Sequence, residues 1–222
     1  MRWDCEVGLM DLLVTGFGPF PHVRVNPTTT LAKAVASRLA RSGLDARALV
    51  VETSYSGGLP TLRKRLAKAR PRAVLMLGLA ARARFVRVEL FARGHSSRLH
   101  PDKTGGTPAG RLQGAPALPL RTTGNPQGAL AMLRRSGIAT QLSASAGRYL
   151  CDACYAAALS DTKGTATPVL FVHVPWLKPA PGTRPTERSR GFRPDAGTLA
   201  DALAMIGRSL VVQGRREQAA FR

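Results

Sequence analysis

Acidic side chains are scarce in this sequence. Thirteen Asp and Glu residues stand against 33 Lys and Arg residues, which gives a formal net charge of +20 over 222 residues and a sequence pI of about 11.6. Such an excess of positive charge attracts polyanions without specificity at low salt. Aromatic residues make up only 5% of the chain, the arginines are spread over every segment, and no zinc-finger, RNP or basic-zipper pattern is present. We therefore expect no specific nucleic-acid partner.

Cysteines are also few, and long apolar runs are missing. The three cysteines, Cys5, Cys151 and Cys154, are too few and too unevenly placed for a disulfide framework, which favours a reducing, cytoplasmic location. No apolar run is long enough to cross a bilayer, and the first residues lack the basic and apolar stretches of a signal peptide; no membrane partner is expected. We expect residues 1–10 to be a disordered extension or a misassigned start, and residues 11–222 to form a single α/β domain.

The first half of the chain alternates between strand and helix patterns. Strands are predicted at 12–15, 46–52 and 73–78, with amphipathic helices at about 30–42, which Asn26-Pro27 caps, and at 59–69. This β-α-β-α-β order predicts a mostly parallel sheet with right-handed crossovers and helices on both faces. Further strands are predicted at 85–92, 139–142 and 169–174, helices at 127–136 and 198–212, and irregular segments at 93–124 and 178–194. Ligands of such sheets bind beyond the carboxyl ends of the strands.

One cysteine and one histidine occupy positions suited to covalent catalysis. Cys151 falls in the first turns of a predicted helix capped by Ser143 or Ser145, where backbone N–H groups and the helix dipole favour a thiolate. His173 ends a buried strand about twenty residues later, and a nucleophile and a base on neighbouring elements are what covalent catalysis needs. A carboxylate on the imidazole, for which Glu89 is the candidate, would fix the tautomer. The ion pair is expected to lower the pKa of the thiol from about 8.5 into roughly the 3.5–7.5 range.

Other interpretations of these residues remain open. Cys151 and His173 are each also compatible with a plain core position. Cys151 and Cys154 form a Cys-x-x-Cys pair, which a redox centre or a zinc site uses, but the pair lies late in the chain and further ligands at zinc spacing are missing. We expect Cys154 to pack in the core. Phe17 and Phe20 lie in a Gly/Pro-rich loop after the first strand, where they form a wall suited to a small flat ring such as a lactam.

Four segments together resemble the pyroglutamyl peptidase I (pyrrolidone carboxyl peptidase) family. They are Leu12-Leu-Val-Thr-Gly-Phe17-Gly-Pro-Phe20 with Asn26-Pro27, Gly78-Leu-Ala with Val88-Glu89, Ser145-Ala-Gly-Arg-Tyr-Leu-Cys151, and Phe171-Val-His173-Val-Pro175. The resemblance implies a three-layer α/β/α sandwich and a cytosolic cysteine peptidase without metal or cofactor. It implies removal of N-terminal pyroglutamate from peptides, and often a tetramer. By position, Cys151 would be the nucleophile, His173 the base and acid, and Glu89 the orienting carboxylate, with Phe17 and Phe20 holding the pyrrolidone ring.

Three positions depart from the pattern of that family. Gly18 stands where an acidic residue is usual, Asp152 where asparagine is common, and Ala83 where an arginine is common. The extra carboxylate of Asp152 lies next to the expected thiolate. Two further functions are compatible with the chain: a catalytically altered relative that binds a polyanion through its basic surface, and a Cys-x-x-Cys redox protein.

Overall fold

A mixed six-stranded sheet forms the centre of the computed structural model, which describes residues 10–97, 99–108, 117, 119–179 and 192–220. The strands, in the order β2-β1-β3-β8-β4-β7 across the sheet, are Ala46–Val51, Leu12–Phe17, Ala73–Leu79, Val169–Val174, Val86–Glu89 and Thr140–Ser143. All neighbours run parallel except β4 and β8, which are antiparallel. The mostly parallel sheet predicted from the sequence is confirmed.

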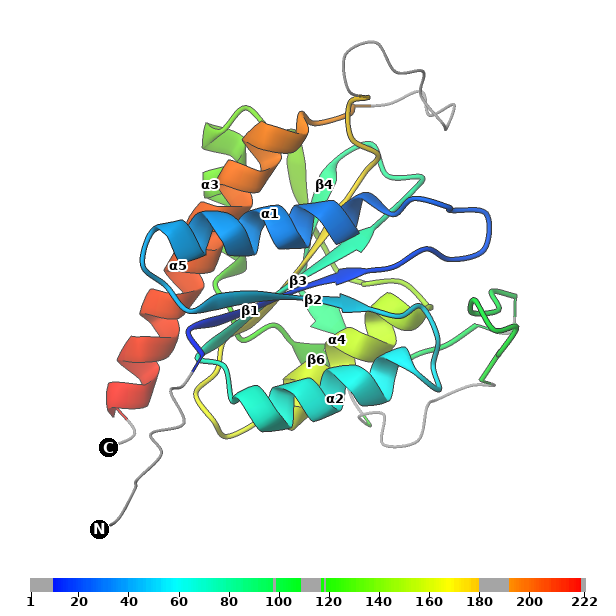
Figure 1. The fold of residues 1–222 in the computed structure, drawn as a ribbon, viewed down its shortest axis with the longest axis horizontal. Helices are drawn as coiled ribbons and strands as arrows, with labels where there is room; N and C mark the ends of the chain where they lie inside the picture. Colours follow the sequence, from blue (N-terminus) through cyan, green and yellow to red (C-terminus); the bar gives the residue numbers. More distant parts are fainter. Residues whose placement is uncertain (1–9, 98, 109–116, 118, 180–191, 221–222) are drawn as a thin grey trace.

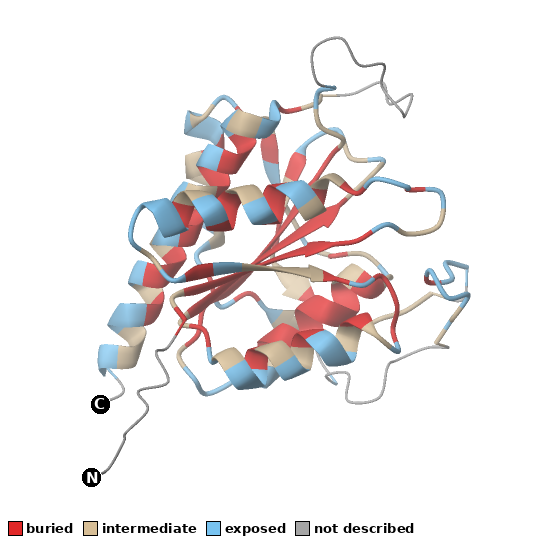
Figure 2. Ribbon diagram, viewed as in Figure 1, coloured by how far each residue is buried: buried red, intermediate tan, exposed pale blue. Residues whose placement is uncertain are grey.

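Helices cover both faces of this sheet (Figure 1). One face packs against α1 (Pro27–Arg41), α3 (Pro126–Arg135) and α5 (Ala196–Ala220), and the other packs against α2 (Gly58–Ala69) and α4 (Leu150–Asp161). The strands supply both cores by alternation: Leu12 and Val14 face the first group of helices, whereas Leu13 faces the second. Figure 2 shows buried residues along the strands and the inner sides of the helices. The molecule is therefore a three-layer α/β/α sandwich, as expected.

The start of α1 shows how the sequence brings a helix close to the sheet. Asn26 caps it by accepting a hydrogen bond from the Thr28 N–H at 3.1 Å, and Pro27 occupies the first turn. A Cβ at Gly16 would lie 2.2 Å from the Thr28 carbonyl oxygen, so only glycine permits this approach of β1 to α1. The loop between β1 and α1, which carries Phe20, is thereby fixed at both ends.

Two predictions about local structure are wrong. Neither Ser143 nor Ser145 caps α4; Tyr149 is the N-cap, without a side-chain hydrogen bond, because Gly147 adopts a φ of +93° and turns the chain first. The strand predicted over 85–92 ends at Glu89, and β5 (Phe91–Ala92) leaves the main sheet to pair with β6 (Leu120–Arg121).

The predicted chain extension is described only at its end. Met10 is buried in the core on the α2–α4 side of the sheet, and its carbonyl accepts the Arg72 N–H at 2.8 Å. Residues 1–9 lie outside the described residues, as do Cys5 and parts of the irregular segments 93–124 and 178–194. None of the helices that the structure describes is long and apolar enough to span a membrane.

Candidate active site

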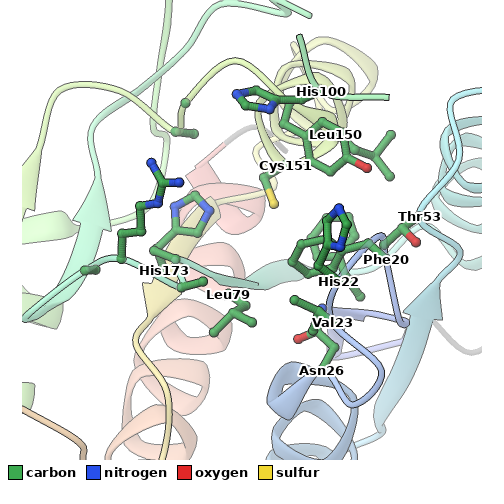
Figure 3. Close-up of a pocket in the computed structure, with 18 of the residues that line it drawn as sticks. Phe20, His22, Val23, Asn26, Thr53, Leu79, His100, Leu150, Cys151 and His173 are labelled. Atoms are coloured by element: carbon green, nitrogen blue, oxygen red, sulfur yellow. The ribbon is translucent and has the colours of Figure 1, made fainter. Parts of the chain in front are cut away.

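A cavity of about 840 Å³ opens at the carboxyl ends of β1, β2, β3 and β8 (Figure 3). It is lined by the end of β1 and the loop after it, by Thr53 after β2, by the end of β3 and the loop after it, by Arg87 of β4, by His100, by residues 146–151 around the start of α4, and by the end of β8. Four of the five predicted site residues, Phe17, Phe20, Cys151 and His173, are among its lining residues. The position agrees with the rule that ligands bind at this edge of an open α/β sheet.

His173 and Glu89 form a buried pair beside this cavity. Nδ1 of His173 lies 2.8 Å from Oε1 of Glu89, and both side chains are almost completely shielded from solvent. Glu89 lies opposite Phe171 in the antiparallel β4–β8 pair, so its side chain reaches His173 diagonally on the same face. With Nδ1 bound to the carboxylate, Nε2 is the ring nitrogen left for chemistry.

Arg87, which no sequence motif indicated, joins this pair. Its Nε lies 3.2 Å from the same Oε1 of Glu89, it lies opposite His173 in the β4–β8 register, and it lines the cavity. The sequence contained this information. In a strand, residues two apart point to the same face, so a strand that places Glu89 beside the site also places Arg87 there. Glu89 Oε2 has no hydrogen-bond partner among the described residues.

Cys151 is the second residue of α4, and its side chain lines the cavity from this helix. Figure 3 shows its sulfur directed into the same space as the ring of His173. The pKa of the thiol is raised to about 12, first by burial and then by the carboxylates of Glu89 and Asp152, which outweigh the opposite effect of Arg87 and of the Cys151 backbone N–H. The expectation of a lowered pKa is therefore wrong, and the resting thiol is neutral.

Asp152 and Cys154, the neighbours of Cys151 on α4, have structural positions. The buried Asp152 carboxylate accepts the N–H groups of Arg93 at 3.0 Å and His95 at 2.7 Å, which fastens the segment after β5 to the start of α4. Cys154 is fully buried in the core, as predicted, and forms no disulfide with Cys151. Within the described residues, no group of three His, Cys, Asp or Glu side chains is placed to hold a metal ion.

The aromatic wall differs from the expected pair of phenylalanines. Phe17 is only 2% exposed and packs on Phe171, with ring centroids 6.4 Å apart, so it contributes little open surface. Phe20 is half-buried and packs against Tyr149, with ring centroids 6.3 Å apart; Tyr149 lines the cavity although no sequence motif indicated it. Tyr149 in turn meets Tyr55 edge-on at 6.1 Å. The flat apolar surface at this end of the cavity is thus mainly that of Phe20 and Tyr149.

A clamp centred on Asp102 holds the segment after β5 against the cavity. The buried Asp102 carboxylate accepts hydrogen bonds from the N–H groups of Tyr55, Thr104 and Gly106 and from the Thr104 hydroxyl, at 2.7–2.9 Å. The Tyr149 hydroxyl donates to the Pro101 carbonyl at 3.2 Å. His100 thereby reaches the cavity mouth, where His22 from the loop after β1 also lies; both side chains are exposed.

Comparisons with known proteins agree with this arrangement. Residues 10–185 match the family described as pyroglutamyl peptidase. The chain is 33% identical over 177 residues to a pyrrolidone-carboxylate peptidase of Gloeobacter violaceus, covering 76% of this chain and 82% of that protein. It is 31% identical over 172 residues to one of Thermococcus kodakarensis, covering 75% and 82%.

Solved structures of similar proteins give the same result. The pyrrolidone carboxyl peptidase of Thermus thermophilus matches with a TM-score of 0.76 and 29% identity over 90% of this chain and 99% of that one. The pyroglutamyl peptidase I of Bacillus amyloliquefaciens matches in fold with a TM-score of 0.77 and 23% identity, covering 91% and 97% of the two chains. The match of the family to most of the chain, the identity to its members and the shared fold lead to one conclusion: this chain belongs to the pyroglutamyl peptidase family of cysteine peptidases.

Proposed function

We propose that this chain hydrolyses the amide bond after an N-terminal pyroglutamyl (5-oxoproline) residue of small peptides. Cys151 is the nucleophile, His173 the general base and acid, and Glu89 the carboxylate that orients the imidazole. The observation that supports this best is the buried 2.8 Å contact between Glu89 and His173 at a cavity that Cys151 also lines. A satisfied core histidine would not need a carboxylate partner beside a thiol and an open cavity.

The reaction begins with a proton transfer, because the resting thiol is neutral. Nδ1–H of His173 donates to Glu89, which leaves the lone pair of Nε2 to accept the thiol proton as sulfur attacks the carbonyl carbon. Glu89 stabilises the imidazolium that results. The raised pKa of Cys151 favours a neutral thiol at rest over a standing thiolate–imidazolium ion pair.

Backbone N–H groups at the start of α4 suit the charge that develops on the carbonyl oxygen. The backbone N–H of Cys151 lowers the pKa of its own thiol, so it lies close to the sulfur that attacks the carbonyl carbon. The first N–H groups of a helix have no partner within the helix, and donors held in place at such a point favour an oxyanion over the neutral carbonyl. The imidazolium then protonates the leaving amine, and water activated by the same imidazole hydrolyses the thioester.

The apolar end of the cavity fits the acyl group of this substrate class. Phe20 and Tyr149 offer flat faces to a five-membered lactam ring, which carries no charge. A pyroglutamyl residue therefore needs no ionic partner at this end. Phe17, which also lines the cavity, contributes a small part of this apolar surface.

Hydrolysis of a chromogenic pyroglutamyl amide tests the proposal. We expect turnover by the native chain, loss of turnover in Cys151→Ser and after alkylation, and most of the turnover retained in Cys154→Ala. Cys154→Ala is the matched control because that thiol lies one helical turn away but in the core. Activity lost in Cys154→Ala but kept in Cys151→Ser would show that the nucleophile is wrongly assigned.

We further propose a cytoplasmic location and a homo-oligomer, a tetramer in the simplest case. A reducing compartment keeps the Cys151 thiol available for attack, and tetramers are what the family resemblance implies. Light scattering after size exclusion measures the subunit number, and a monomer at all concentrations would contradict the oligomer.

A further inference from the structure

The charged residues around the cavity are all of one sign. Arg82, Arg87 and Arg148 line it, and no Asp or Glu is among the lining residues that the structure describes. The three arginines come from the loop after β3, from β4 and from the segment just before α4. A cleft lined by one sign of charge concentrates ligands of the other sign.

Two of these arginines have no carboxylate partner among the described residues. Arg82 and Arg148 are exposed at the rim, and neither forms an ion pair within the described part of the chain. Arg87 differs because it contacts Glu89. The nearby carboxylates of Glu89 and Asp152 are buried and already have partners, the first in His173 and Arg87 and the second in two backbone N–H groups.

Arg82 lies on the side of the cavity where the leaving amine of the substrate must bind. His173 protonates the leaving amine in the proposed reaction, so that amine must lie on the His173 side of Cys151. Figure 3 shows Phe20 and His22 on the other side of Cys151. Gly78 pairs with His173 in the β3–β8 register, and the Ala80 N–H binds the Val174 carbonyl at 2.9 Å, so the loop that carries Arg82 leaves the sheet right beside His173.

We propose that Arg82, with Arg148 adding positive charge at the cavity rim, forms a carboxylate-binding subsite that selects pyroglutamyl peptides with a carboxylate close after the scissile bond. The carboxylate is that of an acidic side chain in the residue after pyroglutamate, or the free C-terminus of a very short peptide. This inference rests on the proposed function and names its substrate class. Exposed guanidinium groups bind carboxylates weakly one by one, so two of them give a preference of about tenfold rather than an absolute requirement.

Four substrates measure this preference: pyroglutamyl-Ala-amide, pyroglutamyl-Glu-amide, pyroglutamyl-Lys-amide and pyroglutamyl-Ala with a free carboxylate. At low salt we expect kcat/KM for the Glu amide to exceed that for the Lys amide by about tenfold. The ratio shrinks toward one at about 1 M salt, where the Debye length is about 3 Å. The Ala substrate with a free carboxylate, compared with its amide, shows whether a C-terminal carboxylate serves as well as a side chain.

Charge-reversal variants assign the preference to the two arginines. Arg82→Glu and Arg148→Glu are expected to lower the Glu-to-Lys ratio severalfold each. Arg84→Glu is the matched control, since Arg84 is exposed two residues from Arg82 but does not line the cavity. A ratio near or below one in the native chain, or a ratio that neither reversal lowers more than the control does, overturns the subsite. No cleavage of the uncharged pyroglutamyl-Ala-amide would instead overturn the proposed function itself.

Discussion

Gly78 lies directly against the ring of His173. The two residues are partners in the parallel β3–β8 register, and a Cβ at Gly78 would fall 2.8 Å from Cδ2 of His173 and equally close to two ring atoms of Phe171. Phe171 is fully buried and has no room to move away. The imidazole therefore keeps its place over Glu89 only because residue 78 has no side chain.

Gly78→Ala is expected to displace the imidazole from Glu89. Overpacking of this kind costs about 1–3 kcal/mol of unfolding free energy, and loss of the base's alignment lowers kcat by about 10²-fold. Gly18→Ala is the control, because a Cβ there meets only the Val51 carbonyl oxygen at 3.7 Å. Urea unfolding and steady-state kinetics measure both effects; a Gly78→Ala variant with native kcat would show that the ring position is not critical.

Glu89→Gln tests the charge of the orienting group with little change in shape. The amide oxygen can still accept from Nδ1–H, but it cannot stabilise the imidazolium, so kcat is expected to fall by about 10²–10⁴-fold. Arg87 loses its carboxylate partner as well. Steady-state kinetics on a pyroglutamyl amide measures the loss, and circular dichroism checks the fold. A fall of less than about fivefold would remove Glu89 from the mechanism.

The raised pKa of Cys151 predicts an unusual pH dependence of alkylation. An acid whose pKa is raised stays protonated to higher pH, and only the thiolate reacts. Iodoacetamide labelling of Cys151 in the free enzyme is therefore expected to accelerate about tenfold per pH unit through pH ~9 without a plateau, approaching the pKa of about 12. A plateau at or below pH ~8.5 would contradict the neutral resting thiol.

Asp152→Asn tests one cause of that raised pKa. Removing a carboxylate beside the thiol lowers its pKa, so labelling at fixed pH should become several times faster. The variant also loses one of the two acceptors for the Arg93 and His95 N–H groups, at a cost of about 1–3 kcal/mol. Labelling is followed by mass spectrometry in a Cys154→Ala background; a rate no faster than in that background alone would assign the raised pKa to burial and Glu89.

Asp102→Ala is expected to loosen the segment that reaches the cavity mouth. Three backbone N–H groups lose their acceptor, which costs about 2–4 kcal/mol, and KM should rise more than kcat falls. Asp195→Ala is the control: Asp195 accepts the Thr198 N–H near the start of α5 but does not line the cavity, so KM should stay unchanged. Equal KM effects in the two variants would mean that the clamp does not shape the site.

The Asp102 clamp also makes a pH prediction. Burial alone would raise the pKa of Asp102, but its hydrogen bonds to Thr104, Tyr55 and Gly106 together lower it below the ordinary value. A carboxylate with a lowered pKa in the folded state contributes stability above the unfolded pKa of about 3.9, which is lost as pH falls through the folded pKa. Native and Asp102→Ala chains should therefore converge in unfolding free energy as the pH is lowered in this range.

Local patterns in the sequence predicted most strands and helices of the fold, but they predicted less of the site. The strands 12–15 and 73–78 and the cap at Asn26 follow from apolar runs and short-range hydrogen bonds, which a sequence displays directly. The break after Glu89 depends on pairing with residues 120–121, a partner thirty residues away that no local pattern indicates. The same holds for the antiparallel direction of β4.

The environment of the thiol lay beyond sequence reasoning for a related reason. The helix start was correctly placed near Cys151, but burial and two carboxylates outweigh the dipole, and burial is a property of the packed structure. Tyr149 was overlooked as a cavity residue because its neighbours Phe20 and Tyr55 come from other elements. The pairing of Glu89 with His173, 84 residues apart, was expected from chemistry and from the family resemblance, and the structure confirms that contact.

The most direct test of the account is to trap the acyl-enzyme. Acid quenching of the Cys154→Ala chain during turnover of a pyroglutamyl amide, followed by fragmentation of the peptide that contains residue 151, shows where the acyl group resides. We predict a pyroglutamyl thioester on Cys151, which forms in the Cys154→Ala chain and is absent when Cys151→Ser is added. Turnover that proceeds with the acyl group on another residue, or with no covalent adduct in a quench fast enough to capture one, would contradict Cys151 as the nucleophile.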